Sequence, residues 1–244
     1  MAELAAAPGR RLPVQLRRAP QGLALVHDTN GPRVRWGIVW FLVTVTAAAV
    51  SQAVLGLVMA LAAALAADQM MRLWDSDAAA VYGSRPRGLL TDPRRLPALL
   101  GAAALPLAAG FGADARAVAA ALPALVVLTL AQRLVTSAWQ PPHGRATPDT
   151  AFAVAVATAL GLAAAAPVLA HGFGAQAAVV VVILICVYDA GDFIVGSGST
   201  TWWEGPAAGV AAVAVATFAI SVAPLSPVDA PAAYALGGLT ALLA

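Results

Sequence analysis

Three acidic residues stand close together between two long apolar runs of the sequence. They are Asp189, Asp192 and Glu204, in the stretch YDAGDFIVGSGSTTWWEG at residues 188–205. The chain has only 12 acidic residues in 244, and an ionisable side chain beside lipid hydrocarbon is costly unless it serves a function. These three carboxylates are therefore the first candidates for chemistry.

Asp189 and Asp192 are three residues apart near the end of an apolar run, so on a continuous helix both carboxylates share one face. Two anions near a helix C-terminus oppose the helix dipole, and a bound cation explains them better than local stability does. Mg²⁺ is typically held by one or two carboxylates, water and substrate phosphates. The spacing predicts a Mg²⁺ site at Asp189 and Asp192; acids that only mark the membrane boundary are the alternative.

A run of small and hydroxylated residues follows the two aspartates. Its backbone N–H groups and hydroxyls could approach phosphate oxygens closely. The run lacks the lysine of a phosphate-binding P-loop, so a flexible turn is the other interpretation. The candidate phosphate-binding residues in it are Gly196, Ser197, Gly198, Ser199, Thr200 and Thr201.

Composition indicates which elements must position these residues. The chain is 61% hydrophobic and 11% charged, against about 25% charged in soluble domains. The chain has one cysteine, Cys186, so it can form neither an internal disulfide nor a cysteine metal site. Its net charge is only +2, and no surface pattern of basic and aromatic residues is evident, which argues against nucleic acid as a partner. We expect an all-α bundle of transmembrane helices. Uncharged runs cover residues 36–67, 96–113, 117–132, 150–170, 172–188, 205–228 and 230–244.

The first of these runs is too long for one ordinary membrane crossing. A single helix over residues 36–67 would be about 48 Å long, whereas the hydrocarbon layer is about 30 Å thick. The run is either one tilted helix or a hairpin folded about Ser51 and Gln52. In a hairpin, either the second helix continues through Asp68 and Met71 toward Trp74, or the bilayer thins locally.

The distribution of arginine favours the hairpin. With a hairpin, 13 of the 14 basic residues lie on one side and only Arg116 on the other; with a single helix the division is seven against seven. Cytoplasmic loops carry an excess of arginine and lysine. We therefore predict eight helices, or seven if residues 36–67 form one, with both termini and the polar site on the cytoplasmic side of the cell membrane. A basic cytoplasmic segment, 1–35, would precede the transmembrane domain, 36–244.

The order of residues within the opening stretch resembles one family of membrane enzymes. D-A-G-D-F-I-V-G followed by W-E-G-P-A-A-G is similar to the phosphatidate cytidylyltransferases, which carry D-x-G-A-Y-x-x-G and then S-P-x-K-T-W-E-G-x-x-G-G. Asp189, Gly191 and Gly196 fall on the first pattern, with Phe193 at the aromatic position. The residues on the second pattern are Trp203, Glu204, Gly205 and Gly209. The similarity covers about 22 residues; elsewhere it is architectural.

This resemblance implies a bundle of helices with a polar cavity facing the cytoplasm. It implies a reaction between CTP and phosphatidic acid that gives CDP-diacylglycerol and pyrophosphate, with Mg²⁺ as the cofactor. By this resemblance, Asp189 and Glu204 would be catalytic residues, and Asp189 would also bind the metal ion. Gly205 would belong to the phosphate-binding site, together with the run of small and hydroxylated residues from Gly196 to Thr201. Asp192 is a metal-site candidate from its spacing alone, because the family pattern has no acid there.

The sequence also departs from the family pattern. The positions where the family has lysine are occupied by Thr200, Thr201 and Trp202. The polar loop is about ten residues shorter than in the family. The family's C-terminal Lys-Asp and Gly-His-Gly-Gly-Asp-Arg segments do not precede Ala244. There are two alternative functions: a non-catalytic scaffold or accessory subunit, and a polyprenol or phytol kinase. The sequence leaves open whether the protein forms a homodimer. The arginines considered as substitutes for lysine are Arg72, Arg85, Arg87, Arg94, Arg95, Arg133 and Arg145.

Overall fold

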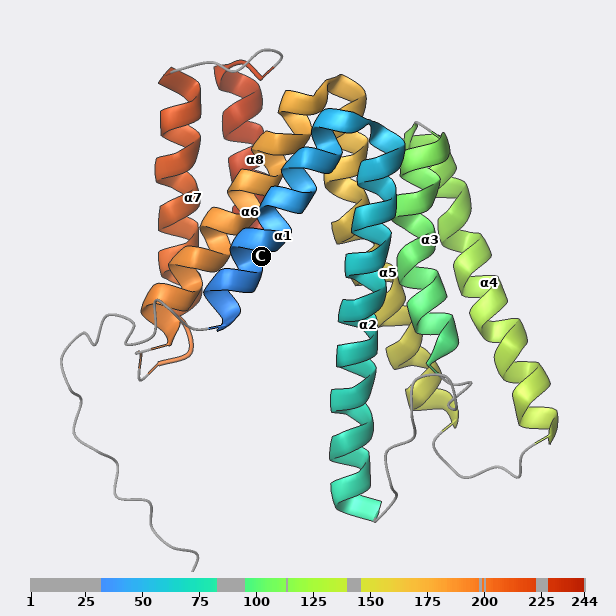
Figure 1. Cartoon of the computed structure of the whole chain (residues 1–244). Coiled ribbons are helices and arrows are strands. Elements are labelled where there is room, and N and C mark those ends of the chain that lie inside the picture. The colour runs from blue at the N-terminus through green and yellow to red at the C-terminus, as the bar shows by residue number, and fades with distance from the viewer. Residues whose placement is uncertain are drawn as a thin grey trace, which may run out of the picture.

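The computed structural model describes residues 32–82, 95–112, 114–139, 146–197, 199, 201–222 and 228–243; within helices, the side chains of residues 32–34, 75–82, 132–139, 146–149 and 242–243 are not described. The regular elements of this part of the chain are all helical, which confirms the all-α prediction (Figure 1). The basic segment 1–35 lies almost entirely outside the described residues. The elements are α1 (Pro32–Val50), α2 (Gln52–Tyr82), α3 (Leu96–Gly112), α4 (Ala115–Trp139), α5 (Ala146–Ala170), the short 3₁₀ helix η2 (His171–Phe173), α6 (Ala175–Gly196), α7 (Glu204–Val222) and α8 (Ala230–Leu243).

The first two helices form the hairpin that the arginine distribution predicts. α1 ends at Val50 and α2 begins at Gln52, and the hydroxyl of Ser51 accepts a hydrogen bond of 3.2 Å from the N–H of Val54. A side-chain acceptor of this kind satisfies one of the free N–H groups at a helix start. At the end of α1, the carbonyl of Ala48 accepts a hydrogen bond of 2.8 Å from His171 Nε2. Both helix ends at the bend are therefore stabilised by side chains.

The second helix continues past the uncharged run, which is one of the two possibilities for the hairpin. α2 runs without a break through Asp68 and Met71, and its apolar span covers Gln52–Trp74. Those 23 residues make a helix of about 34 Å, which is enough to cross the hydrocarbon layer. The hairpin is thus compatible with a bilayer of ordinary thickness.

Successive helices alternate in direction, so the connections fall at two ends of the molecule (Figure 1). One end carries the α6–α7 turn, the start of α1 and the C-terminal end of α2; we call it the motif end. The other carries Ser51, the α3–α4 turn, η2 and the start of α8, and we call it the hairpin end. All three acidic candidates from the sequence lie at the motif end.

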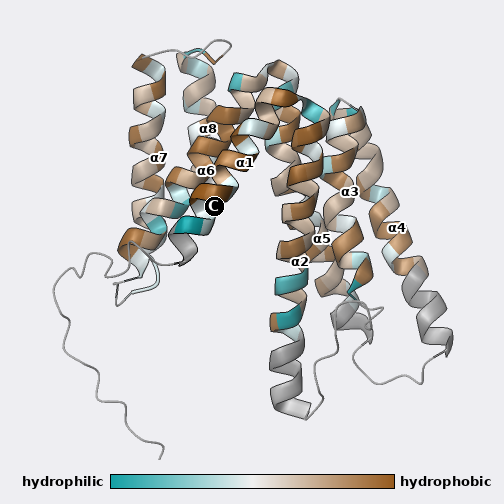
Figure 2. Cartoon of the chain, viewed as in Figure 1, coloured by the Kyte–Doolittle hydropathy of each residue, from teal (hydrophilic) through white to brown (hydrophobic). Residues whose placement is uncertain are grey.

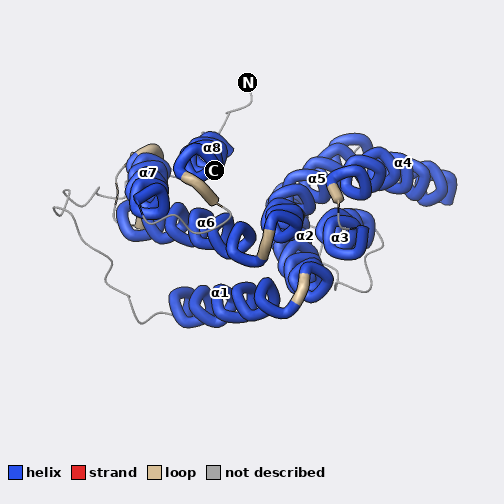
Figure 3. Tube along the Cα trace, turned by 90° about the horizontal axis from the view of Figure 1, so that it is seen from above, coloured by secondary structure: helices blue, strands red, loops and turns tan. Residues whose placement is uncertain are grey.

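The helices form two groups when the molecule is viewed from above (Figure 3). α2 to α5 pack together around fully buried side chains that include Leu55, Leu105 and Val168. α6, α7 and α8 form the second group, and α1 runs alongside it. Glycine allows the closest approach in the first group: a Cβ at Gly56 would lie 3.0 Å from the Cα of Gly110. Contacts between small residues of this kind are typical of helices that pack within lipid.

Hydrophobic residues make up much of the helices (Figure 2), and many large apolar side chains are exposed. Leu61, Val127 and Phe218 are each more than half exposed, whereas soluble monomers rarely expose large contiguous apolar patches. Among the described residues, four helices are long and apolar enough to cross a membrane, and they indicate a membrane protein. These spans are Gln52–Trp74, Thr150–Phe173, Ala175–Gly196 and Glu204–Val222, with shorter apolar helices at Arg35–Val50, Leu96–Gly112 and Ala115–Ala131.

Candidate functional site at the turn between α6 and α7

Asp189 and Asp192 both lie on α6, because this helix continues to Gly196 rather than ending before them. The expectation that the two carboxylates share one helix is therefore correct. Their environments differ: Asp189 is exposed, whereas Asp192 is half-buried against the start of α7. Of the two, only Asp192 lies against the glycines of the turn, Gly196 and Gly205.

Four glycines between residues 191 and 209 bring the backbones of α6 and α7 into contact. A Cβ on Gly191 would lie 2.8 Å from the carbonyl oxygen of Ala208, and one on Gly209 would lie 2.8 Å from the ring of Tyr188. Nearer the turn, a Cβ on Gly205 would lie 3.0 Å from the Cα of Gly196. These positions need glycine for helix packing, which is a sufficient physical reason for the glycines even without a ligand.

The carboxylate of Asp192 lies at this glycine contact. Its Oδ1 occupies the space that a side chain at Gly205 would fill, and it lies 3.5 Å from where a Cβ on Gly196 would be. The missing side chains of both glycines thus make room for the carboxylate between the two helices. This packing fixes where Asp192 points relative to α7.

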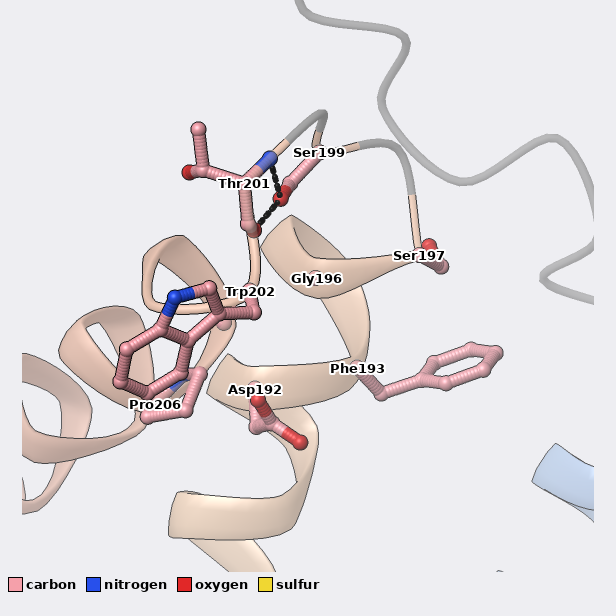
Figure 4. A pocket seen from close by; sticks show the side chains of 9 residues that line it. Asp192, Phe193, Gly196, Ser197, Ser199, Thr201, Trp202 and Pro206 are labelled. Carbon is pink, nitrogen blue, oxygen red and sulfur yellow. Dashed lines mark hydrogen bonds between the residues drawn. The ribbon is translucent and has the colours of Figure 1, made fainter.

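The polar residues after α6 form a connected set of hydrogen bonds (Figure 4). The hydroxyl of Ser199 accepts from the N–H of Thr201 at 3.2 Å and donates to the Thr201 carbonyl. The hydroxyl of Thr201 in turn donates to Glu204 Oε1 at 2.6 Å. Glu204 stands in the first turn of α7, where a carboxylate is favoured by the helix dipole. Gly198 and Thr200 lie outside the described residues.

A pocket of about 480 Å³ opens at this turn. It contains six of the residues that the sequence analysis selects, whereas Asp189 and Glu204 do not line it. Phe193, Trp202 and Pro206 line it as well, although no pocket role was predicted for them. Trp202 lies beside Pro206 (Figure 4). The lining residues are Asp192, Phe193, Gly196, Ser197, Ser199, Thr201, Trp202, Gly205 and Pro206.

The donor set for a metal ion at this site is small. The described part of the chain holds no group of three or more His, Cys, Asp or Glu side chains placed to bind a metal. Asp189 and Asp192 could supply two carboxylates, so water and substrate phosphate would have to complete the shell, as is common for Mg²⁺. The Mg²⁺ site stays a prediction, and so does phosphate binding by the turn.

The arginines considered as phosphate partners do not join this pocket where the structure describes them. Arg72 and Arg95 both pair with Asp68 at the motif end of α2 and α3, which is well separated from the α6–α7 turn (Figure 1). The side chain of Arg133 is not described, and the others lie outside the described residues: Arg85, Arg87, Arg94 and Arg145.

Comparison with family models, with curated proteins and with solved structures finds no match to this chain. The resemblance to the phosphatidate cytidylyltransferases therefore rests on the residues between Tyr188 and Gly209 alone.

Proposed function

We propose that this chain is a membrane nucleotidyltransferase that transfers CMP from CTP to the phosphate of a lipid, phosphatidic acid, in phospholipid biosynthesis. The observation that carries the proposal is the pocket at the α6–α7 turn. There, Asp192 lines the same pocket as Ser197, Ser199 and Thr201, within a stretch whose order follows the family pattern. The site would face the cytoplasm, where nucleotides are available.

In the proposed reaction, a phosphate oxygen of phosphatidic acid attacks the α-phosphorus of CTP. The bond between this phosphorus and the oxygen that bridges to the β-phosphate breaks, so pyrophosphate leaves and CDP-diacylglycerol remains. Both reactants are polyanions, and Mg²⁺ would supply the charge that offsets their repulsion. The protein contributes mainly by holding the two reactants in line.

Each residue of the turn has a role in this proposal. Asp192, which lines the pocket, and Asp189, three residues earlier on the same helix, would hold the metal ion. Glu204 would keep the Thr201 hydroxyl in place through the hydrogen bond of 2.6 Å between them. The hydroxyls and backbone N–H groups of the turn would contact phosphate oxygens.

A direct test uses the purified protein, phosphatidic acid and CTP labelled at the α-phosphate. We expect label in a lipid product that forms only when Mg²⁺ is present. Label transferred from the γ-phosphate of a nucleotide to a polyprenol would instead indicate a lipid kinase. If label enters no lipid from either position, catalysis is disproved.

A non-catalytic scaffold is the second candidate function. Two observations favour it: no basic side chain lines the pocket in the part of the chain that the structure describes, and the glycines of the motif are accounted for by packing. Titration calorimetry with CTP and Mg²⁺ separates the candidates. An enzyme should bind the complex, whereas a pure scaffold should release or absorb no heat of binding.

A further inference from the structure

A second cavity, of about 250 Å³, lies between α7 and α8, which run side by side (Figure 3). Val213, which is 1% exposed, lies at its base, whereas Val210 and Tyr234 are 40% and 53% exposed and border its opening. The cavity is therefore a groove on the outer surface of the helix bundle. We call it the α7–α8 groove.

Among the described residues, the α7–α8 groove offers an occupant almost no polar group. The hydroxyl of Thr217 is buried and lies against Gly237 of α8. The hydroxyl of Tyr234 shares a hydrogen bond of 3.3 Å with that of Ser221. The remaining lining residues are valine, alanine and glycine. Because a polar or charged ligand would lose its hydrogen bonds to water there, a hydrocarbon occupant is favoured.

One face of α7 connects this groove with the pocket at the α6–α7 turn. Pro206 lines the pocket, whereas Val210, Val213 and Thr217 line the groove. Residues four, seven and eleven positions apart lie on the same face of a helix, and residues four apart are neighbours on its surface. The groove therefore begins one helical turn from the pocket, on the same side of α7.

The length of this face matches the depth of one membrane leaflet. Thr217 lies eleven residues after Pro206, which is about 16 Å along the helix axis. One leaflet contributes about half of the 30 Å hydrocarbon thickness, or about 15 Å. Trp202 and Trp203 immediately precede α7, and tryptophan is enriched at the level of lipid headgroups. A lipid whose headgroup lies at this turn can therefore extend one chain along α7 as far as Thr217.

We propose that the α7–α8 groove holds one acyl chain of the phospholipid whose phosphate enters the pocket at the α6–α7 turn. This proposal rests on the proposed function, because it needs a lipid phosphate at that turn. A transmembrane helix is at least about 10 Å wide, so it would rest on the edges of a groove of about 250 Å³ rather than fill it. Surrounding lipid is as apolar as the groove, so the groove fixes the position of the chain and adds little to the affinity.

Photocross-linking of the detergent-solubilised full chain tests this proposal. The probe is phosphatidic acid with a diazirine halfway along one acyl chain, added in the presence of phosphatidylcholine. We expect label on α7 within residues 210–217 and on α8 within residues 237–241. Excess unlabelled phosphatidic acid should remove this label, whereas the same excess of phosphatidylcholine should not. Equal competition by the two lipids, or label spread evenly over all the exposed helices, would overturn the proposal.

Gly238→Leu tests the position of the chain. Gly238 lines the groove, and nothing lies within 4 Å of a Cβ there, so leucine should fill the groove and remove most of its label. Gly37→Leu on α1 is the matched control, because Gly37 is also exposed with open space around a Cβ, and it should leave the label unchanged. Undiminished label in folded Gly238→Leu contradicts the proposal. If Gly238→Leu does not fold, the label map and the lipid competition of the wild type decide.

The outcomes for this chain site and for catalysis are separable. Label in the groove without transfer of CMP supports the chain site and contradicts only the catalytic proposal. Transfer of CMP by a wild type whose groove takes no label overturns the chain site alone. A second copy of the chain is the other occupant to test. In a Cys186→Ala background, a disulfide-linked dimer of Gly238→Cys would place that copy in the groove and overturn the proposal.

Discussion

Two buried threonines on different helices differ in whether their hydroxyls are satisfied. Thr129 and Thr217 are each 4% exposed. Thr129 Oγ1 donates to the carbonyl of Leu125 at 2.8 Å, whereas Thr217 Oγ1 has no hydrogen-bond partner among the described residues. Thr217 instead packs directly against Gly237 of α8, where an added Cβ would overlap its hydroxyl. A buried hydroxyl without a partner lowers stability.

Replacing Thr217 with valine should therefore stabilise the protein. The change keeps the shape of the side chain and removes an unpaired polar atom, and we expect a gain of about 1 kcal/mol in the free energy of unfolding. Thr129→Val is the matched control and should lose up to about 1 kcal/mol, because it removes a hydrogen bond that is made. Thermal unfolding in detergent, followed by circular dichroism, measures both. A lower melting temperature for Thr217→Val than for Thr129→Val would contradict this account.

At the scale of elements, the contact between α6 and α7 depends on glycine. The pattern G-x-x-x-G at residues 205–209 is visible in the sequence, yet the family resemblance implies that Gly205 binds phosphate. The structure adds a packing role, because both glycines face α6. A pattern of small residues on its own does not reveal whether a ligand or another helix occupies the space beside it.

Gly209→Ala should separate the two helices. The new methyl group would lie 2.8 Å from the ring of Tyr188 and 3.0 Å from its carbonyl oxygen, and such overpacking typically costs about 1–3 kcal/mol. Gly238→Ala on α8 is the control, since nothing lies within 4 Å of a Cβ there and alanine favours a helix by about 1 kcal/mol over glycine. Melting temperatures should fall for Gly209→Ala and stay level or rise for Gly238→Ala; the opposite order would refute the packing role.

Some features of the elements could be predicted from sequence and others could not. Counting arginines identified the hairpin at Ser51, because membrane orientation depends on charge, which a sequence shows directly. The pairing of Asp68 with Arg95 was not predicted, because it joins two helices across a long connection and depends on how α2 packs against α3. For the same reason the sequence placed Asp189 and Asp192 together but could not tell that only Asp192 faces the pocket.

At the scale of the whole molecule, the two ends should lie on opposite sides of the membrane, with the motif end in the cytoplasm. Cys186 is the only cysteine in the chain, so a Cys186→Ala background allows single-site labelling. Ser197 is exposed at the motif end. Gly172 at the hairpin end has open space around a Cβ, so a side chain fits at either position.

In that background, we expect Ser197→Cys to react with a membrane-impermeant maleimide only from the cytoplasmic side. Gly172→Cys should react only from outside the cell. Intact cells and inverted vesicles supply the two sides. The reverse pattern would place the proposed site away from nucleotides, and labelling of both positions from one side would contradict the alternating arrangement of helices.

The central claim is that the acids at the α6–α7 turn support transfer of CMP to a lipid. The measurement closest to it is the rate of label transfer from α-labelled CTP to phosphatidic acid by wild type, Asp189→Asn, Asp192→Asn and a control. Asp114→Asn is suitable as the control, because Asp114 accepts a hydrogen bond of 2.9 Å from the N–H of Ala117 at the hairpin end and asparagine caps a helix equally well.

We predict a Mg²⁺-dependent lipid product from wild type and from Asp114→Asn. Asp189→Asn and Asp192→Asn should each reduce the rate at least about a hundredfold, in line with the loss of a group that positions reactants. Full activity in both aspartate variants, or no labelled lipid from the wild type, would contradict the account.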